Sequence, residues 1–326
     1  MASIFDQALS VGLESTYGTA VAPTRSYEGQ SDDWQREMEY ITSQGFRDGM
    51  QTTRGDRYEN VSLGATGSVS VDVLNKGMGL ILQHSLGASV APAQVGGTAA
   101  YTASFTTNDI GPAGSYTWQM LRTSTNGTVN CFTYEGCKAT NLDFEMALGS
   151  NLNMTIGFDA ENEQIATSAA TPVYVAATSP FPYTQAAIEL DNSAVVNITG
   201  ASVSLDLAMK TDRRFLKGAA TKGEPLRNGV PAYTGSLTAE FSSMADYNRF
   251  VAGSNHKLEL IMTGTTAIAA SNFPFFHITM PQIRFEGATP VASLDDLGSV
   301  EMPFTILDGG VGAAVTIATQ STDTAF

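Results

Sequence analysis

Six acidic residues lie in segments with the alternating pattern of β-strands, and their charge is the clearest chemistry in the chain. They are Asp72, Asp143, Glu145, Asp206, Glu240 and Glu301. Each stands between apolar neighbours, so each is predicted to lie on the polar face of its strand. Carboxylates gathered on one face can repel a passing polyanion. The alternative is that they only face water, as carboxylates on half-exposed sheets commonly do.

The histidines and cysteines show no spacing that catalysis or metal binding would need. None of His84, His256 and His277 is followed by a second histidine or a carboxylate at ligand spacing. Cys131 and Cys137 fall in one expected strand, which would separate them by about 20 Å, whereas a disulfide needs Cα atoms within about 7 Å. They could bond only if Gly136 sharply reverses the chain, so two free, partly buried thiols are expected. No nucleophile elbow or phosphate-binding loop occurs. We therefore expect no enzyme, no metal site and no cofactor.

The overall charge argues against a protein that grips nucleic acid. The chain has 32 acidic and 17 basic side chains among 326 residues, a net charge of −15. Phosphate binding depends on Lys and Arg, and no basic run is present. No apolar run approaches about 18 residues, so no membrane span is expected. Asp6 and Glu14 do not fit a secretory signal, and assembly in a cytosol is expected.

The segments that carry five of the six carboxylates, all but Asp206, form an order of strand, helix and three strands that occurs twice. In the first half these segments are residues 67–73, 76–87, 116–121, 131–146 and 152–158. In the second half they are residues 235–241, 244–253, 257–262, 275–285 and 300–307. Asp72 and Glu240 occupy the same position in the two copies of the Gly-Ser strand. Repetition of a whole unit indicates duplication and a symmetric assembly.

These patterns predict a mainly β fold with two tandem β-sandwich domains, each with one flanking helix. The first domain is expected at residues 35–163 and the second at 183–326, joined by a linker at 164–182 that is rich in Ala, Thr, Ser and Pro. Residues 1–34 are expected to be an irregular arm that becomes ordered on another surface. Gly18 and Pro23 interrupt any regular period there.

Between the strands of the second half lies a turn-rich segment, here called the basic loop (residues 213–227). Five of the 17 basic residues lie in it, namely Arg213, Arg214, Lys217, Lys222 and Arg227. It is predicted either to be an exposed loop or to reach an acidic surface on a neighbouring subunit.

If the two sheets close side by side into a ring, the six carboxylates would line a channel. Phosphates moving through it would be repelled from every wall. Open sheet edges would be satisfied by neighbouring copies, because closure into a barrel removes edges.

Short motifs along nearly the whole chain resemble those of phage tail tube (major tail) proteins of long-tailed phages. In order, these motifs are residues 14–20 with Pro23 and Thr24, Leu86-Gly87, Phe132-x-Tyr134-x-Gly136-Cys137-Lys138 leading to Leu142, Asn197-Ile198-Thr199, 235–238, and Met280-Pro281. The resemblance implies a β-sandwich tube domain that forms rings. The rings would stack into a hollow virion tail that conducts the genome without specific DNA binding.

The same resemblance implies a tape-measure protein inside the tube, tail-end proteins as partners and assembly in the host cytoplasm. A simple tube protein carries one such domain, whereas this chain is predicted to carry two. A trimeric ring with pseudo-sixfold symmetry, a barrel of roughly 24 strands, is therefore favoured over a hexamer. Tyr17, Gly18 and Pro23 are candidates for contacts between rings. Alternatives are a tube subunit of a bacterial injection apparatus and a two-domain β-sandwich adhesin or carbohydrate binder.

Overall fold

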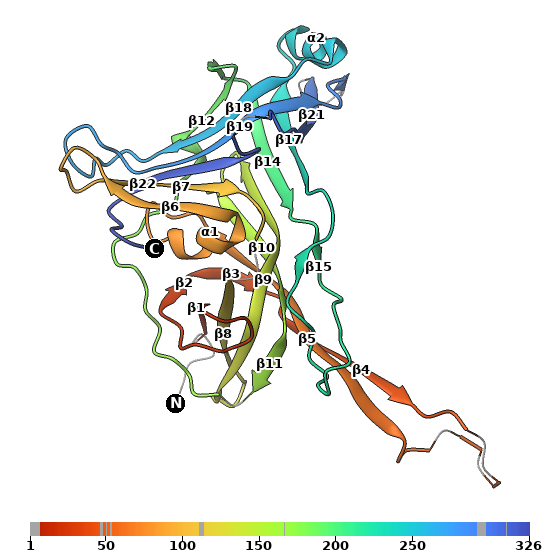
Figure 1. Cartoon of the computed structure of the whole chain (residues 1–326). Coiled ribbons are helices and arrows are strands. Elements are labelled where there is room, and N and C mark those ends of the chain that lie inside the picture. The colour runs from red at the N-terminus through yellow and green to blue at the C-terminus, as the bar shows by residue number, and fades with distance from the viewer. Residues whose placement is uncertain are drawn as a thin grey trace.

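Alternating apolar and polar residues build a mainly β structure (Figure 1). The computed structural model describes residues 7–45, 48–49, 51–52, 54–110, 114–165, 167–291, 298–310 and 312–326. Within these ranges there are two α-helices, α1 (Gly79–Ser85) and α2 (Ala245–Ala252), and neither could span a membrane. The predicted mainly β class is confirmed.

One antiparallel sheet, here called the long sheet, runs through both halves of the chain. In pairing order its strands are β3 (Gly29–Asp32) with β4 (Gln35–Thr42), β5 (Tyr58–Asp72), β10 (Asn153–Ala160), β9 (Val129–Ala147), β14 (Ile198–Asp206), β17 (Ala232–Glu240) and β21 (Ser299–Ile306). Because β9 of the first half pairs with β14 of the second, the two halves share this sheet.

Two further groups of strands pack on the apolar face of the long sheet. The first group is β2 (Arg25–Tyr27), β1 (Ala8–Glu14), β8 (Ser115–Thr123), the start of β9 and β11 (Asn162–Ile165). The second is β13 (Ser193–Val195), β12 (Ala186–Leu190), β18 (His256–Thr263), β19 (Phe275–Phe285), β22 (Thr316–Ser321), β7 (Tyr101–Thr107) and β6 (Gly87–Gln94).

Aromatic side chains fill the space between the long sheet and these two groups. The ring centroids of Trp118 and Phe158 lie 5.3 Å apart in the first half, and those of Phe144 of the first half and Phe276 of the second lie 5.9 Å apart. All four rings are buried, so they exclude water from the core.

The smaller elements lie at the ends of this framework. The 3₁₀-helix η1 (Tyr183–Gln185) precedes β12, and β15 (Met209–Lys210) pairs with β16 (Leu226–Arg227) at the base of the basic loop. β20 (Pro290–Val291) pairs with β21.

The order of strand pairing is the same in the two halves of the chain. In the first half β1, β8, β9, β10 and β5 pair in that sequence, and in the second β12, β18, β19, β21 and β17 do so. The register matches as well: Asp72 pairs with Asn153, and Glu240 pairs with Ser299. Each Gly-Ser strand is followed by a helix, α1 or α2.

The N-terminal segment differs from the irregular arm expected at residues 1–34, of which residues 1–6 lie outside the described residues. β1 pairs with β2 and along its whole length with β8. Leu9 and Val11 are buried in the core, which explains why this segment folds within its own chain. Residues 15–24 are irregular, and so are residues 167–179 of the predicted linker.

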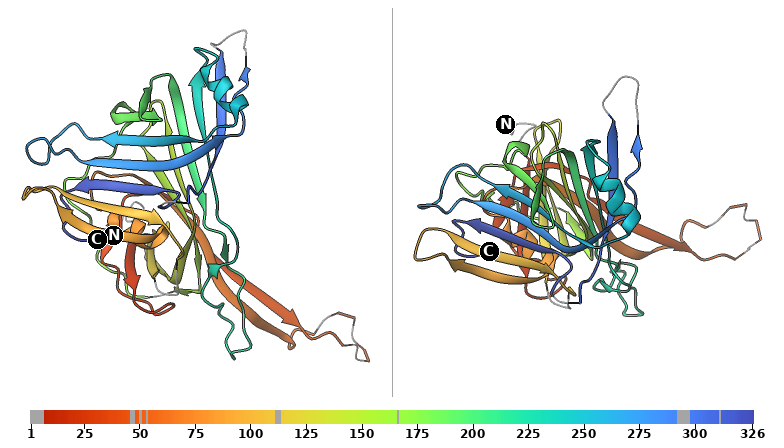
Figure 2. Two further views of the ribbon diagram at one scale, coloured as in Figure 1. Left: turned by 45° about the horizontal axis from the view of Figure 1, so that its top comes forward. Right: turned by 90° about the horizontal axis from the view of Figure 1, so that it is seen from above.

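Two hairpins were not expected from the sequence. The first, β6–β7, follows α1 and pairs with β22, whereas α2 leads directly to β18. The second, β4–β5, projects away from the body of the molecule (Figures 1 and 2). Apolar side chains along this hairpin are exposed. They include Tyr40 and Tyr58, whose stacked rings have centroids 4.5 Å apart.

Candidate functional site

The face of the long sheet that points away from the core is here called the polar face. It is polar because side chains along each strand alternate between the two faces of the sheet. On β5, for example, Val69 and Val71 are buried while Ser70 and Asp72 point to the opposite side. Strand register carries this face from strand to strand. One row of paired residues contains Asp72, Asn153, Glu145, Ser202, Ser236 and Pro303.

All six predicted carboxylates lie on the polar face. Asp72 and Glu145 belong to the row just described. The next row contains Ser70, Thr155, Asp143, Ser204, Thr234 and Thr305. Asp206 pairs with Asn141, Glu301 with Thr238 and Glu240 with Ser299. The structure thus brings together side chains from five strands.

Neutral donors hold several of these carboxylates in place. Asp143 accepts hydrogen bonds from the Ser204 hydroxyl at 2.5 Å and from the Asn141 amide at 2.6 Å. Asp72 accepts one from Gln30 at 2.7 Å and one from Asn151 at 3.1 Å. Neutral donors orient a carboxylate without cancelling its charge.

No cation pairs with the six carboxylates. The two rows carry no Lys or Arg, whereas Lys138 of β9 pairs with Asp159 further along this face and is buried against Glu224 of the basic loop. Among the described residues, no salt bridge involves any of the six carboxylates. Fixed charges of one sign on one surface create a field that repels polyanions.

Residues 5–317 match the family model described as phage tail tube protein. The chain belongs to the phage tail tube protein family. No curated protein matches it. The match covers nearly the whole chain, so this tail tube protein has a structural role in a virion tail. Neither an injection-apparatus subunit nor an adhesin is favoured.

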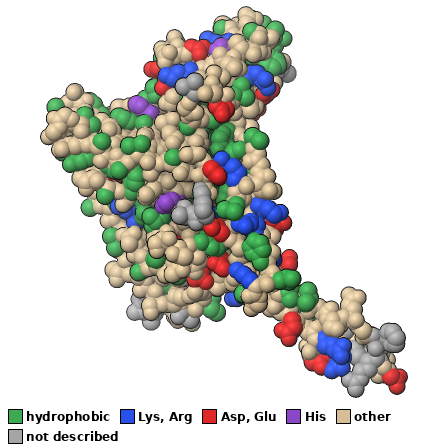
Figure 3. Space-filling view, viewed as in Figure 1, with side chains coloured by type: hydrophobic (Ala, Val, Ile, Leu, Met, Phe, Trp, Pro, Cys, Tyr) green, Lys and Arg blue, Asp and Glu red, His purple; other side chains and the backbone are tan. Residues whose placement is uncertain are grey.

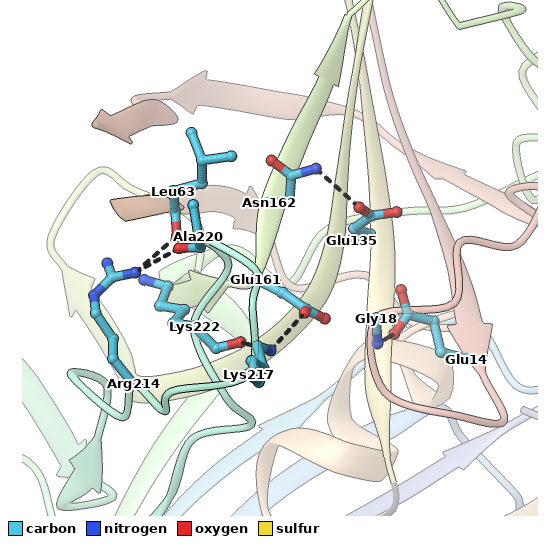
Figure 4. A network of polar contacts seen from close by, with 10 residues as sticks. All are labelled: Glu14, Gly18, Leu63, Glu135, Glu161, Asn162, Arg214, Lys217, Ala220 and Lys222. Carbon is cyan, nitrogen blue, oxygen red and sulfur yellow. Dashed lines mark hydrogen bonds and ion pairs between the residues drawn. The ribbon is translucent and has the colours of Figure 1, made fainter. Parts of the chain in front are cut away.

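The basic loop of this tail tube protein docks on acidic residues of its own chain (Figure 4). Lys217 lies 3.7 Å from Glu161, and Arg214 donates to the carbonyl oxygens of Leu63 and Ala220 at 3.2 and 3.0 Å. Basic and acidic side chains lie side by side along this part of the surface (Figure 3). The loop is therefore not simply exposed, and the acidic surface that it reaches belongs to the same chain.

Glu14 forms a buried cluster at the end of β1 that sequence reasoning did not identify. Its carboxylate accepts hydrogen bonds from the hydroxyls of Ser115 and Thr117 at 2.5 and 2.8 Å. It also accepts from the backbone N–H groups of Gly136 and Gly18 at 2.9 and 3.1 Å. Burial raises the pKa of Glu14, although the four donors favour its charged form.

The three residues proposed for contacts between rings lie in the loop that Glu14 anchors. Gly18 has a φ of 71° and binds Glu14 through its N–H. The Tyr17 ring lies so close to Gly136 that a Cβ there would approach it to 3.0 Å. Pro23 is half-buried. Tyr17 and Gly18 thus contact their own chain, and a contact with another ring stays a prediction.

The histidines and cysteines have ordinary structural surroundings. His256 contacts Asp191 at 2.7 Å, and the rings of His277 and Phe275 stack 4.2 Å apart. Burial lowers the pKa of His84 and of His277. Both cysteines are free and buried. In the part of the chain that the structure describes, no group of three His, Cys, Asp or Glu residues could hold a metal ion.

Proposed function

We propose that the polar face lines the lumen of the tail tube and keeps the genome from adhering during ejection. The observation that carries this proposal is the gathering of six carboxylates on one continuous face, without any Lys or Arg in the two rows that cross it. A polyanion beside such a wall gains no counterion release and is repelled at close range. The tube then works as a conduit, without catalysis and without specific DNA binding.

We propose further that the chain is a tandem duplication and that three chains close one ring. Support comes from the matching pairing order and register of the two halves. Each half gives the long sheet about four strands if β3 is counted with β4, and β20 with the end of β19. Three chains then give a barrel of roughly 24 strands, wide enough to keep an open lumen.

The junction between β9 and β14 is a template for the contact between chains. Inside the chain the edge of the first half, β9, pairs with the first long-sheet strand of the second half. The corresponding edge of the second half is formed by the end of β19 and by β20. The strand of the next chain that corresponds to β14 is β4, counted together with β3. Such pairing would cover the exposed β4 edge, which otherwise invites uncontrolled association.

The β4–β5 hairpin would strengthen this junction. It occupies the same place in the first half that the basic loop occupies in the second, between the first two strands of the long sheet. The basic loop packs on the preceding half, so the β4–β5 hairpin would pack on the preceding chain. Exposed Met38, Tyr40, Ile41 and Tyr58 supply apolar area for that contact.

The symmetry of the tube tests the ring proposal. Electron cryomicroscopy of assembled tubes should show threefold rings in which both halves line the lumen, and native mass spectrometry of a ring should give three chains. A hexameric ring with only one half in the wall would overturn the proposal. Stacked rings would enclose a tape-measure protein and meet tail-end proteins, with assembly in the host cytoplasm.

Charge reversal tests the lumen itself. Replacing Asp72 and Glu240 with Lys should leave tube assembly intact but slow genome delivery, because phosphates would bind the wall. A matched double replacement of Asp109 and Asp308, which lie outside the long sheet, controls for the change in total charge. Location of Asp72 and Glu240 on the outer surface of the tube would refute the assignment, whatever the mutants do.

A further inference from the structure

The Lys222 amine is buried between two carboxylates that come from a different half of the chain. Its side chain is 2% exposed and that of Asp159, on β10, is 1% exposed. Lys222 Nζ donates to Asp159 Oδ1 and, at 3.1 Å, to Glu37 Oε2 on β4. The channel and the ring do not require this group, and an amine held between two carboxyl groups has its own chemistry.

The backbone fixes the amine in this place. Leu63 of β5 forms an isolated parallel bridge with Thr221, and its N–H donates to the Ala220 carbonyl at 2.9 Å. Gly64 supplies the space, because a Cβ there would lie 2.7 Å from Lys222 Cε and 2.9 Å from Nζ. A side chain at position 64 would therefore displace the amine from the two carboxyl groups.

The surroundings favour the neutral form of the Asp159 carboxyl group. Burial raises the pKa of Asp159 to about 6, although Lys222 favours the charged carboxylate. Asp159 Oδ2 is buried and has no hydrogen-bond partner among the described residues. Transfer of the proton from the ammonium to the carboxylate removes two buried charges at once. The products are a nucleophilic amine and a protonated carboxyl group in contact with it.

We propose that Lys222 and Asp159 are joined by an intramolecular isopeptide bond that forms after folding, with Glu37 as the proton carrier. Lys222 Nζ attacks Cγ of the protonated Asp159 side chain, and the Nζ–Cγ bond forms. Glu37 accepts a proton from the attacking nitrogen and gives it to the departing hydroxyl group. The Cγ–O bond breaks and one water leaves. No oxidant, reductant or other reactant is needed.

The bond would tie the basic loop of the second half to β10 of the first half. The β9–β14 pairing holds the halves together by hydrogen bonds, and an amide between Lys222 and Asp159 adds a covalent bond. It would close the 63-residue separation between the two side chains. The closed loop restricts the unfolded chain, as a disulfide does, but without sensitivity to reducing agents.

Mass spectrometry of the purified full-length protein tests this proposal. The intact denatured mass should lie below the sequence mass by about 18 Da, one water. Trypsin should release residues 139–210 joined to residues 218–227, because a lysine acylated at position 222 is not cleaved. An intact mass equal to the sequence mass, with those two peptides separate, would overturn the proposal.

Three variants separate this bond from other losses of water. Lys222→Arg should have the mass calculated from its own sequence, with no water lost. Glu37→Gln should leave a larger unlinked fraction in freshly folded protein. Lys138→Arg is the matched control, because Lys138 is equally buried and lies 2.6 Å from Glu224. The control should keep the branched peptide. Persistence of the branched peptide in Lys222→Arg would refute the assignment.

Discussion

Glu14→Ala is expected to destabilise the protein strongly, although position 14 lies in what the sequence presents as an irregular leader. The substitution removes the acceptor for four donors. The hydroxyls of Ser115 and Thr117 can rotate, and water can reach the N–H of Gly18. The N–H of Gly136 is buried and stays without a partner. Each buried donor left unsatisfied costs about 1–3 kcal/mol.

The expected loss in the free energy of unfolding is therefore about 1–3 kcal/mol, because one buried donor, the Gly136 N–H, loses its partner while the cost of burying a carboxylate is relieved. Urea unfolding monitored by tryptophan fluorescence measures it, since Trp118 lies in the adjoining strand. Glu39→Ala, on the exposed strand β4, is the control and should change little. A loss for Glu14→Ala no larger than that of the control would refute the buried cluster.

The pH dependence gives a second measurement on the same residue. The pKa of Glu14 is raised in the folded state, so that state binds more protons than the unfolded state between the two pKa values. Its contribution to stability is therefore fully present below the unfolded pKa and is lost as the pH rises through the folded pKa. The stability difference between the wild type and Glu14→Gln should widen as the pH is lowered from neutral toward 4.5. A constant difference would contradict this linkage.

Two further substitutions test the framework. Gly235→Val should prevent stable folding, because a Cβ there would lie 2.3 Å from Phe304 Cζ and 2.4 Å from the Ser202 carbonyl oxygen. The solubility and circular dichroism of the variant measure this effect. A soluble variant with the native fold would contradict this packing. Replacing residues 40–60 by a two-residue turn removes Tyr40, Ile41 and Tyr58 and should leave a folded chain that no longer forms rings. Sedimentation measures the second effect, and normal ring formation would exclude the hairpin from the junction.

Alternation along single strands was enough to predict which carboxylates share a face. Asp143 and Glu145 could be assigned from Leu142 and Phe144 alone, because a strand reverses its side chains at every residue. The sequence also indicated an order of strands and helix that occurs twice. In the structure, the strands of the two halves pair in the same order. That the polar face lines a channel stays a prediction, because a single chain carries no neighbour.

Long-range burial could not be predicted in this way. Glu14 meets Gly136, 122 positions away, and Lys222 meets Glu37, 185 positions away. No local pattern marks either pair, because charged residues in turn-rich segments are normally solvated. The arm was placed outside the core for the same reason: the short alternation of Leu9 and Val11 is a weak signal until β8 is beside it. A deletion of residues 1–30 would therefore remove part of the core.

The β6–β7 hairpin gives the molecule an asymmetry that its polar face does not have. The described residues hold two sets of polar strands in the long sheet but one such hairpin, which follows α1 and has no counterpart after α2. Any ring built from this chain therefore carries half as many hairpins as sets of polar strands. In the proposed tandem duplication, one copy is free to diverge where the other stays constant. In the proposed ring, the lumen keeps a uniform wall while the hairpins stand at alternate positions around it.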